Sequence, residues 1–85
     1  MKNKVLVKII VPEIDLSFDV FIPINEIMWK VKKMIIKTVS DIVNVNFDLN
    51  KKYVIAGNNG KIYKNNELII DTDIRNASEL LLYTM

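Results

Sequence analysis

Few residues in this sequence could carry out chemistry. The 85 residues include neither histidine nor cysteine, so the usual pairing of a nucleophile with a base is not available. Without cysteine the chain also forms no disulfide and no thiolate metal site. Asp71 and Asp73 could be read as metal ligands, but hard cations need more oxygen ligands than two carboxylates supply. We expect both carboxylates to cap a turn, and we predict no catalytic residue, no metal and no cofactor.

The segment Asn58-Asn59-Gly60 could be compared with a phosphate-binding loop. It lacks the run of glycines and the following helix that such loops use. Asn-Gly between extended segments is instead a strong hairpin signal, because both central positions tolerate positive φ. We therefore predict a turn here, between a strand at 53–56 and a short strand at 61–63.

The charge of the chain is nearly balanced. Twelve Lys and Arg oppose ten Asp and Glu, and the formal net charge of +2 argues against an electrostatic nucleic-acid binder. Lys30, Lys33 and Lys37 share one flank of the predicted helix and could touch acidic partners or anionic lipid. Such a run is more often a solvated face. Only Trp29 interleaves with these lysines, so we expect no nucleic-acid platform.

The composition predicts a folded domain away from the membrane interior. Apolar residues make up 51% of the chain, which is enough for a core and excludes intrinsic disorder. No segment approaches the roughly 18 uninterrupted apolar residues of a membrane span, so no direct membrane insertion is expected. Lys8 interrupts the N-terminal apolar run, and no small-residue cleavage site precedes Pro12. We expect one cytoplasmic domain comprising residues 1–85.

Two strands are predicted at the N-terminus. Residues 5–11 alternate, with Val5, Val7, Ile9 and Val11 on one face. Residues 12–15 break the pattern and turn the chain. A second strand then places Phe18, Val20 and Ile22 on one face, and Pro23 ends it because proline lacks a backbone donor. The two strands are predicted to form an antiparallel hairpin.

One helix is predicted, from Asn25 as the N-cap to Asn44, which can adopt the left-handed conformation that ends a helix. At about 100° per residue, one face of it is apolar and is expected to pack on the hairpin. Phe47 and Leu49, in the loop that follows, are expected to fold back over the core. The residues predicted on the buried helix face are Ile27, Val31, Met34, Ile35, Thr38, Val39 and Ile42.

The last third of the chain returns to strands. Residues 71–74 indicate a single capped turn, and residues 80–83 are apolar on both faces, as expected of a central strand. The fold class predicted is α+β, with the element order ββαββ(β). It is a β-grasp, in which a mixed sheet of four to five strands packs on one helix and the terminal strands are adjacent.

This order of elements matches the ubiquitin fold, and short segments add to the likeness. Ile55-Ala56-Gly57, Ile69-x-Asp71-x-x-Ile74 and Ser78-x-Leu80-x-Leu82 resemble ubiquitin's third strand, late turn and last strand. The chain more closely resembles the EsaB/YukD family, small ubiquitin-like proteins encoded with bacterial type VII secretion systems. The similar segments are Phe18-Asp19-Val20, Ile22-Pro23, Asp41-Ile42, Phe47-Asp48-Leu49-Asn50 and Asn66-Glu67-Leu68-Ile69.

The first candidate protein-binding surface is on the helix. Trp29, Ile36 and Val43 are spaced by seven residues and are predicted to align opposite the buried face. A continuous apolar stripe there would be a partner or self-association site. The alternative is that Trp29 covers the hairpin edge and Val43 lies under the following loop, which leaves only Ile36 exposed.

The second candidate surface is the open face of the sheet. If Val7 and Ile9 face the helix, alternate residues face away from it. The alternative is an ordinary half-wet sheet, and a one-residue slip near 80–83 would exchange the faces. The residues predicted on the open face are Leu6, Ile10, Phe21, Val54 and either Leu81 or Tyr83.

The resemblance implies a non-enzymatic, cytoplasmic accessory protein or adaptor of a type VII (WXG-type) secretion system. It would bind a cytoplasmic domain of the secretion machinery noncovalently. The alternative is a structural homo-oligomer outside secretion. Ubiquitin-like modifiers and ThiS/MoaD-type sulfur carriers end in Gly-Gly, whereas this sequence ends in Tyr83-Thr84-Met85 and has no Gly-Gly. We therefore expect no covalent conjugation.

Overall fold

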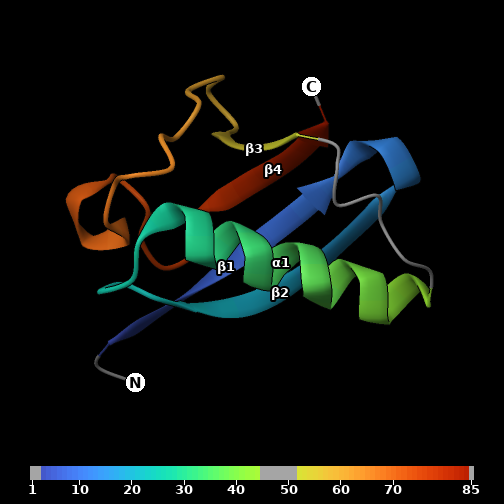
Figure 1. The fold of residues 1–85 in the computed structure, drawn as a ribbon, viewed down its shortest axis with the longest axis horizontal. Helices are drawn as coiled ribbons and strands as arrows, with labels where there is room; N and C mark the ends of the chain where they lie inside the picture. Colours follow the sequence, from blue (N-terminus) through green and yellow to red (C-terminus); the bar gives the residue numbers. More distant parts are fainter. Residues whose placement is uncertain (1–2, 45–51, 85) are drawn as a thin grey trace.

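The computed structural model describes residues 3–44 and 52–84. Four strands and one helix form the main elements of this part of the chain (Figure 1), and two short 3-10 turns connect them. The expected packing of Phe47 and Leu49 falls outside the described residues. The elements are β1 (Lys4–Val11), η1 (Pro12–Ile14), β2 (Leu16–Pro23), α1 (Met28–Val43), β3 (Tyr53–Gly57), η2 (Ile69–Asp71) and β4 (Glu79–Thr84).

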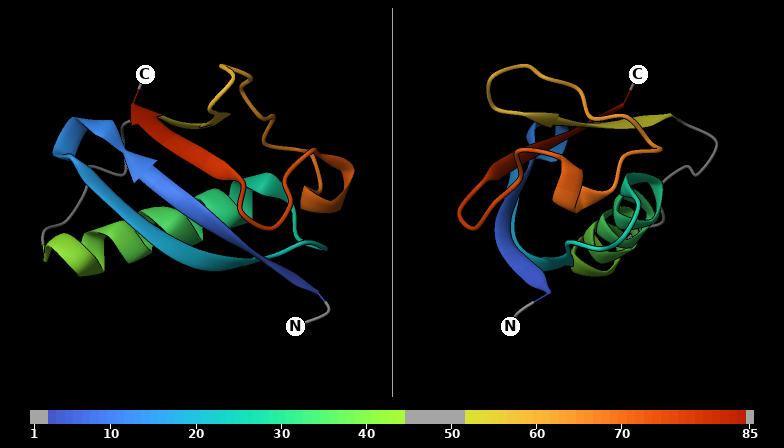
Figure 2. Two further views of the ribbon diagram at one scale, coloured as in Figure 1. Left: turned by 180° about the vertical axis from the view of Figure 1, so that it is seen from behind. Right: turned by 90° about the vertical axis from the view of Figure 1, so that its left-hand side faces the viewer.

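The strands form one mixed sheet in the order β2-β1-β4-β3. The β1–β2 and β3–β4 pairs are antiparallel, whereas β1 and β4, from the two ends of the chain, are parallel. The helix crosses one face of this sheet diagonally (Figure 1). Seen from behind in Figure 2, the opposite face is covered by no helix of the described residues. The predicted β-grasp is confirmed, with four strands.

The N-terminal hairpin forms as its alternation predicts. Val7, Ile9 and Val11 are buried toward the helix, and Phe18 and Val20 pack against the same core from β2. The connecting turn is η1, followed by Asp15 in the left-handed conformation with φ 52°. The β2 strand ends at Pro23. Period-two patterning was sufficient here because each strand buries only one face.

The helix begins two residues later than predicted. Asn25 is not its N-cap: Ile27 occupies that position, without a side-chain cap. The first helical N–H groups are satisfied by a distant segment, since Met28 N donates to Glu67 O (2.8 Å) and Trp29 N to Asn65 O (3.1 Å). Such groups need partners at every helix start, and here tertiary structure supplies them. Asn44 ends the helix with φ 56°, as predicted.

The buried face of α1 is also rotated from the predicted one. Ile36 was expected to be exposed but is only 8% exposed, whereas Ile42, expected in the core, is 49% exposed. Ile27, Met34 and Thr38 are only half-buried. The helix covers the β3 side of the sheet as well as the hairpin, and its last turn contributes no buried residue. The buried helix residues are Met28, Val31, Ile35, Ile36 and Val39.

The turn predicted at 58–60 is present in the structure. Gly60 N donates to Gly57 O (3.0 Å) and Gly57 N to Lys61 O (2.8 Å), and Gly60 has the positive φ, 89°. This is a three-residue loop with glycine in the left-handed position. The returning strand predicted at 61–63 is reduced to one bridge, between Ala56 and Ile62.

Truncation at two positions of α1 tests its orientation. Ile36→Ala should lower the free energy of unfolding by about 2–4 kcal/mol, because it removes buried methylene groups. Ile42→Ala should cost less than about 1 kcal/mol, because that side chain is half exposed. Urea denaturation followed by circular dichroism measures both values. A larger loss from Ile42→Ala would contradict the orientation described here.

Candidate functional site

The outer face of the sheet, opposite α1, carries the sheet-face residues that the sequence predicted. Across the strands, Leu6 is in register with Phe21, Ile10 with Leu81, and Val54 with Tyr83. The ambiguity near the C-terminus is resolved, because Leu80 and Leu82 are buried toward the helix. Leu81 and Tyr83 therefore both lie on the outer face.

A row of charged residues divides this outer face into two apolar parts. Lys8 at the centre is in register with Asp19 on one side and Glu79 on the other. On one side of the row lie Leu6 and Phe21, which are 39% and 46% exposed; we call them the Phe21 cluster. On the other side lies the Leu81 cluster, which comprises Ile10, Val54, Leu81 and Tyr83.

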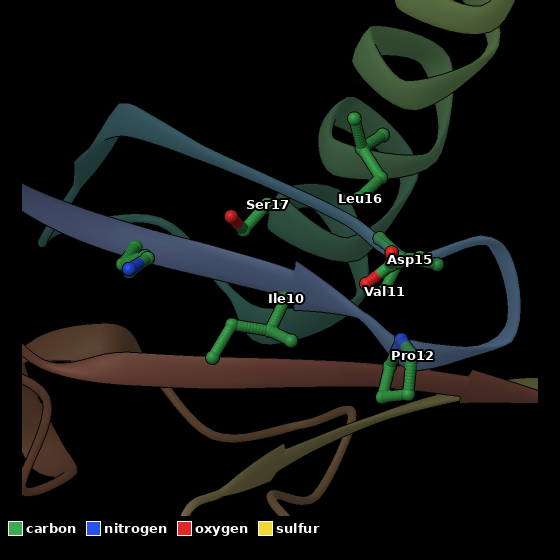
Figure 3. A pocket seen from close by; sticks show the side chains of 7 residues that line it. Ile10, Val11, Pro12, Asp15, Leu16 and Ser17 are labelled. Carbon is green, nitrogen blue, oxygen red and sulfur yellow. The ribbon is translucent and has the colours of Figure 1, made fainter.

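A small hollow of about 160 Å³ adjoins the Leu81 cluster at the end of the hairpin. In Figure 3, the side chains of Ile10 and Ser17 stand on the near side of the strands, whereas Leu16 extends toward α1. Sites for organic ligands are usually at least about 300 Å³. The hollow is therefore smaller than the sites that usually hold organic ligands.

The predicted stripe on the helix is not continuous. Trp29 is 41% exposed, but Ile36 is buried and Val43 is half-buried. The alternative, in which only Ile36 is exposed, is also wrong. Trp29 instead lies beside two lysines, with the Lys33 and Lys30 ammonium groups 5.1 Å and 6.0 Å from its ring centroid.

The turn at 71–74 is organised by Thr72 and not by its two carboxylates. The Thr72 hydroxyl donates to Ile69 O (2.7 Å) and accepts from Ile74 N (3.2 Å). Asp73 Oδ1 accepts a hydrogen bond from the Tyr63 hydroxyl (2.6 Å). Within the described parts of the chain, no three Asp or Glu side chains gather as metal ligands would.

The Tyr63–Asp73 hydrogen bond changes the ionisation of both groups. It is the main reason that the pKa of Asp73 lies below its ordinary value, and Lys61 and Arg75 lower it further. The pKa of Tyr63 is raised, first by burial and then by the hydrogen bond to Asp73. Since the pair fastens the 61–65 segment to the turn after η2, its role is structural.

One surface was missed by the sequence reasoning: a groove between α1 and the edge of β3. Ile62 is 57% exposed beside it, and Lys32, Lys52 and Lys64 line it. The spacing of these lysines gives no periodic signal, because they belong to three separate segments. The groove could have been predicted only if it were known that residues 61–65 pack beside α1.

A four-stranded mixed sheet crossed by one helix, with parallel terminal strands, is the β-grasp fold of ubiquitin-like domains. Among solved structures, the ubiquitin-like domain of EccD5 from Mycobacterium xenopi matches with a TM-score of 0.80 at 12% identity, covering 98% of this chain and 96% of that one. The ubiquitin-like domain of EccD1, a type VII secretion protein of Mycobacterium tuberculosis, gives 0.73 at 16% identity, covering 93% and 96%.

A third match is a chain of the MycP5-free ESX-5 inner membrane complex. Its TM-score is 0.84 at 11% identity over 98% of this chain, which spans only 21% of that longer chain. No protein-family model and no curated protein sequence matches the chain. At identities this low, the structural likeness establishes the ubiquitin-like fold.

No helix in residues 3–44 and 52–84 is long and apolar enough to cross a membrane.

The Tyr63–Asp73 pair predicts a pH dependence of stability. Because the pKa of Asp73 is lowered in the folded state, the ionised Asp73 carboxylate stabilises the fold at pH values above its ordinary pKa of about 4. This contribution is lost as the pH falls through the folded-state pKa. In Tyr63→Phe the donor is absent, so the Asp73 pKa should rise toward that ordinary value. The stability difference between the parent protein and this variant should therefore be largest near neutral pH and shrink as the pH falls below about 4.

Urea denaturation at a series of pH values, together with NMR titration of the Asp73 carboxyl, measures this effect. Tyr83→Phe is the matched control, because the Tyr83 hydroxyl forms no hydrogen bond within the described residues. An unchanged Asp73 titration in Tyr63→Phe would contradict the assignment.

Proposed function

We propose that this chain is a non-enzymatic ubiquitin-like domain of type VII secretion machinery. In this proposal it works in the cytoplasm and docks noncovalently onto a cytoplasmic domain of another component of the machinery. Residues 1–85 act as one domain, and no cofactor takes part. The docking surface is the outer face of the sheet.

The observation that carries this proposal is the uncovered apolar surface on the outer face. Phe21 is 46% exposed, Leu6 39% and Tyr83 38%, although polar side chains would be less costly in contact with water. Apolar patches rimmed by polar residues are typical of protein-binding sites. The charged row through Lys8 would set the orientation of a partner between the two clusters.

The secretion context is supported by the proteins that share this fold. Two of the matched structures are ubiquitin-like domains of EccD proteins, and EccD1 is named as a type VII secretion protein. The resemblance to the EsaB/YukD family points to the same context. Its segments Phe18-Asp19-Val20 and Ile22-Pro23 lie on β2, beside Phe21 of the proposed docking surface.

A non-enzymatic role is supported by the side chains available. The sequence has no histidine or cysteine, and the buried Thr72 hydroxyl is engaged in the turn after η2. Surface complementarity is the chemistry that this fold offers most directly.

Affinity capture from the source cells tests this proposal. The tagged parent protein should retain a type VII secretion component, identified by mass spectrometry. Phe21→Asp and Leu81→Asp should each reduce its recovery about tenfold or more, because a carboxylate in an apolar contact is desolvated without a partner.

Ile70→Asp is the matched control. Ile70 is 53% exposed in η2, beside the start of α1 and away from the outer face. Ile70→Asp should therefore recover as much of the secretion component as the parent protein does. Circular dichroism verifies that all three variants are folded. If Phe21→Asp and Leu81→Asp both recover as much of the secretion component as the parent protein does, the proposed docking surface is wrong. A homodimer that dissociates in both face variants, measured by light scattering, would favour the structural homo-oligomer instead.

A further inference from the structure

The groove between α1 and the edge of β3 concentrates positive charge. Its volume is about 760 Å³, and four lysines line it: Lys32, Lys33, Lys52 and Lys64. No Asp or Glu is among its described lining residues. The net charge of the whole chain is only +2, so this grouping is local. Clefts lined by one sign of charge focus the electrostatic potential and attract the opposite charge.

Lys32 is held in place at the wall of this groove. Its Nζ donates to Tyr53 O (2.8 Å) and to Asn65 Oδ1 (2.7 Å). An ammonium group has three donors, so one remains for a ligand. Partial burial lowers the pKa of Lys32 because it removes water from the charged form. None of the four groove lysines forms an ion pair with the described carboxylates.

Apart from Asn65 and the hydroxyl groups of Tyr53 and Tyr63, the rest of the groove lining is apolar. Ile36 and Tyr53 are buried at its base, and Ile62, 57% exposed, stands at its rim. A groove that combines an apolar base with lysine walls suits a ligand with alternating carboxylates and apolar groups. A flat lipid surface would not reach the base. The two described aromatic side chains of the lining, Tyr53 and Tyr63, are buried and so give nucleic-acid bases no exposed stacking platform.

The β3 edge beside the groove is closed to an added strand. Tyr63 N donates to Ile55 O (3.0 Å), Gly57 N donates to Lys61 O (2.8 Å), and the Tyr53 carbonyl accepts from Lys32. A ligand must therefore bind through its side chains and not by backbone pairing.

We propose that this groove binds an extended acidic peptide segment of a partner protein, with carboxylates on the lysine walls and an apolar side chain over Ile36 and Tyr53. This site lies beside the sheet face of the proposed function and shares Val54 with it. It does not require the partner to belong to a secretion system.

Peptide selection on the intact protein tests this inference. A phage-displayed library of random peptides selected on the immobilised protein should be enriched in peptides that combine Asp or Glu with apolar residues. Affinities of the synthesised peptides are then measured by the fluorescence of Trp29, the only tryptophan, whose ring lies 5.1 Å from the Lys33 ammonium. Binding should weaken as ionic strength rises.

The double variant Lys33→Glu/Lys64→Glu should weaken binding about tenfold or more, because two attractive contacts become repulsive. Lys4→Glu is the control: Lys4 is exposed at the start of β1, on the far side of β4 from β3, and should change the affinity less than about twofold. Phe21→Asp should also leave it unchanged, which separates failure of this site from failure of the sheet face.

Three results would overturn the proposal. The first is selection without enrichment of acidic residues. The second is equal binding of the selected peptides by the parent and by Lys33→Glu/Lys64→Glu. The third is tighter binding of single-stranded DNA or phosphatidylserine vesicles than of the peptides, with the same dependence on Lys33 and Lys64, which would make the groove a general polyanion site.

Discussion

The parallel pairing of β1 with β4 is the interaction on which the rest of the structure depends. It joins the two ends of the chain: Lys8 N donates to Ser78 O (3.0 Å), Ala77 N donates to Leu6 O (2.8 Å), and Ile9 is in register with Leu80. Parallel strands require a long crossover, which here contains α1 and β3. Without this pairing, the hairpin and β3 would be separate, and neither the outer face nor the α1–β3 groove would exist.

The strands could be predicted because their information is local. In β1 the alternation of Val7 and Ile9 with polar or exposed residues reports directly which face is buried. In β4 the run from Leu80 to Tyr83 is apolar on both faces, and only its pairing with β1 and β3 decides that Leu81 and Tyr83 face outward. The register of β4 depends on its pairing with two neighbouring strands, so the sequence of β4 alone could not predict which of its residues face outward.

The start and orientation of the helix could not be predicted, since both depend on distant residues. Backbone groups of Asn65 and Glu67 accept from the first turn of α1, so the helix needs no side chain at Asn25. Apolar residues border the buried face of α1 on both sides, which leaves its orientation ambiguous in the sequence. Ile36 is buried because β3 and the 61–65 segment pack beside it, and this contact is nonlocal.

The two candidate surfaces use residues that the core does not require. Phe21 and Lys33 are exposed, and the core is built from the opposite sides of their elements, so binding and folding can be altered separately. The surfaces meet at Val54, which belongs to the Leu81 cluster and also lines the groove. A partner that covers the Leu81 cluster would therefore compete with a ligand in the groove. A partner confined to the Phe21 cluster would leave the groove open, and the domain could then hold two chains at once.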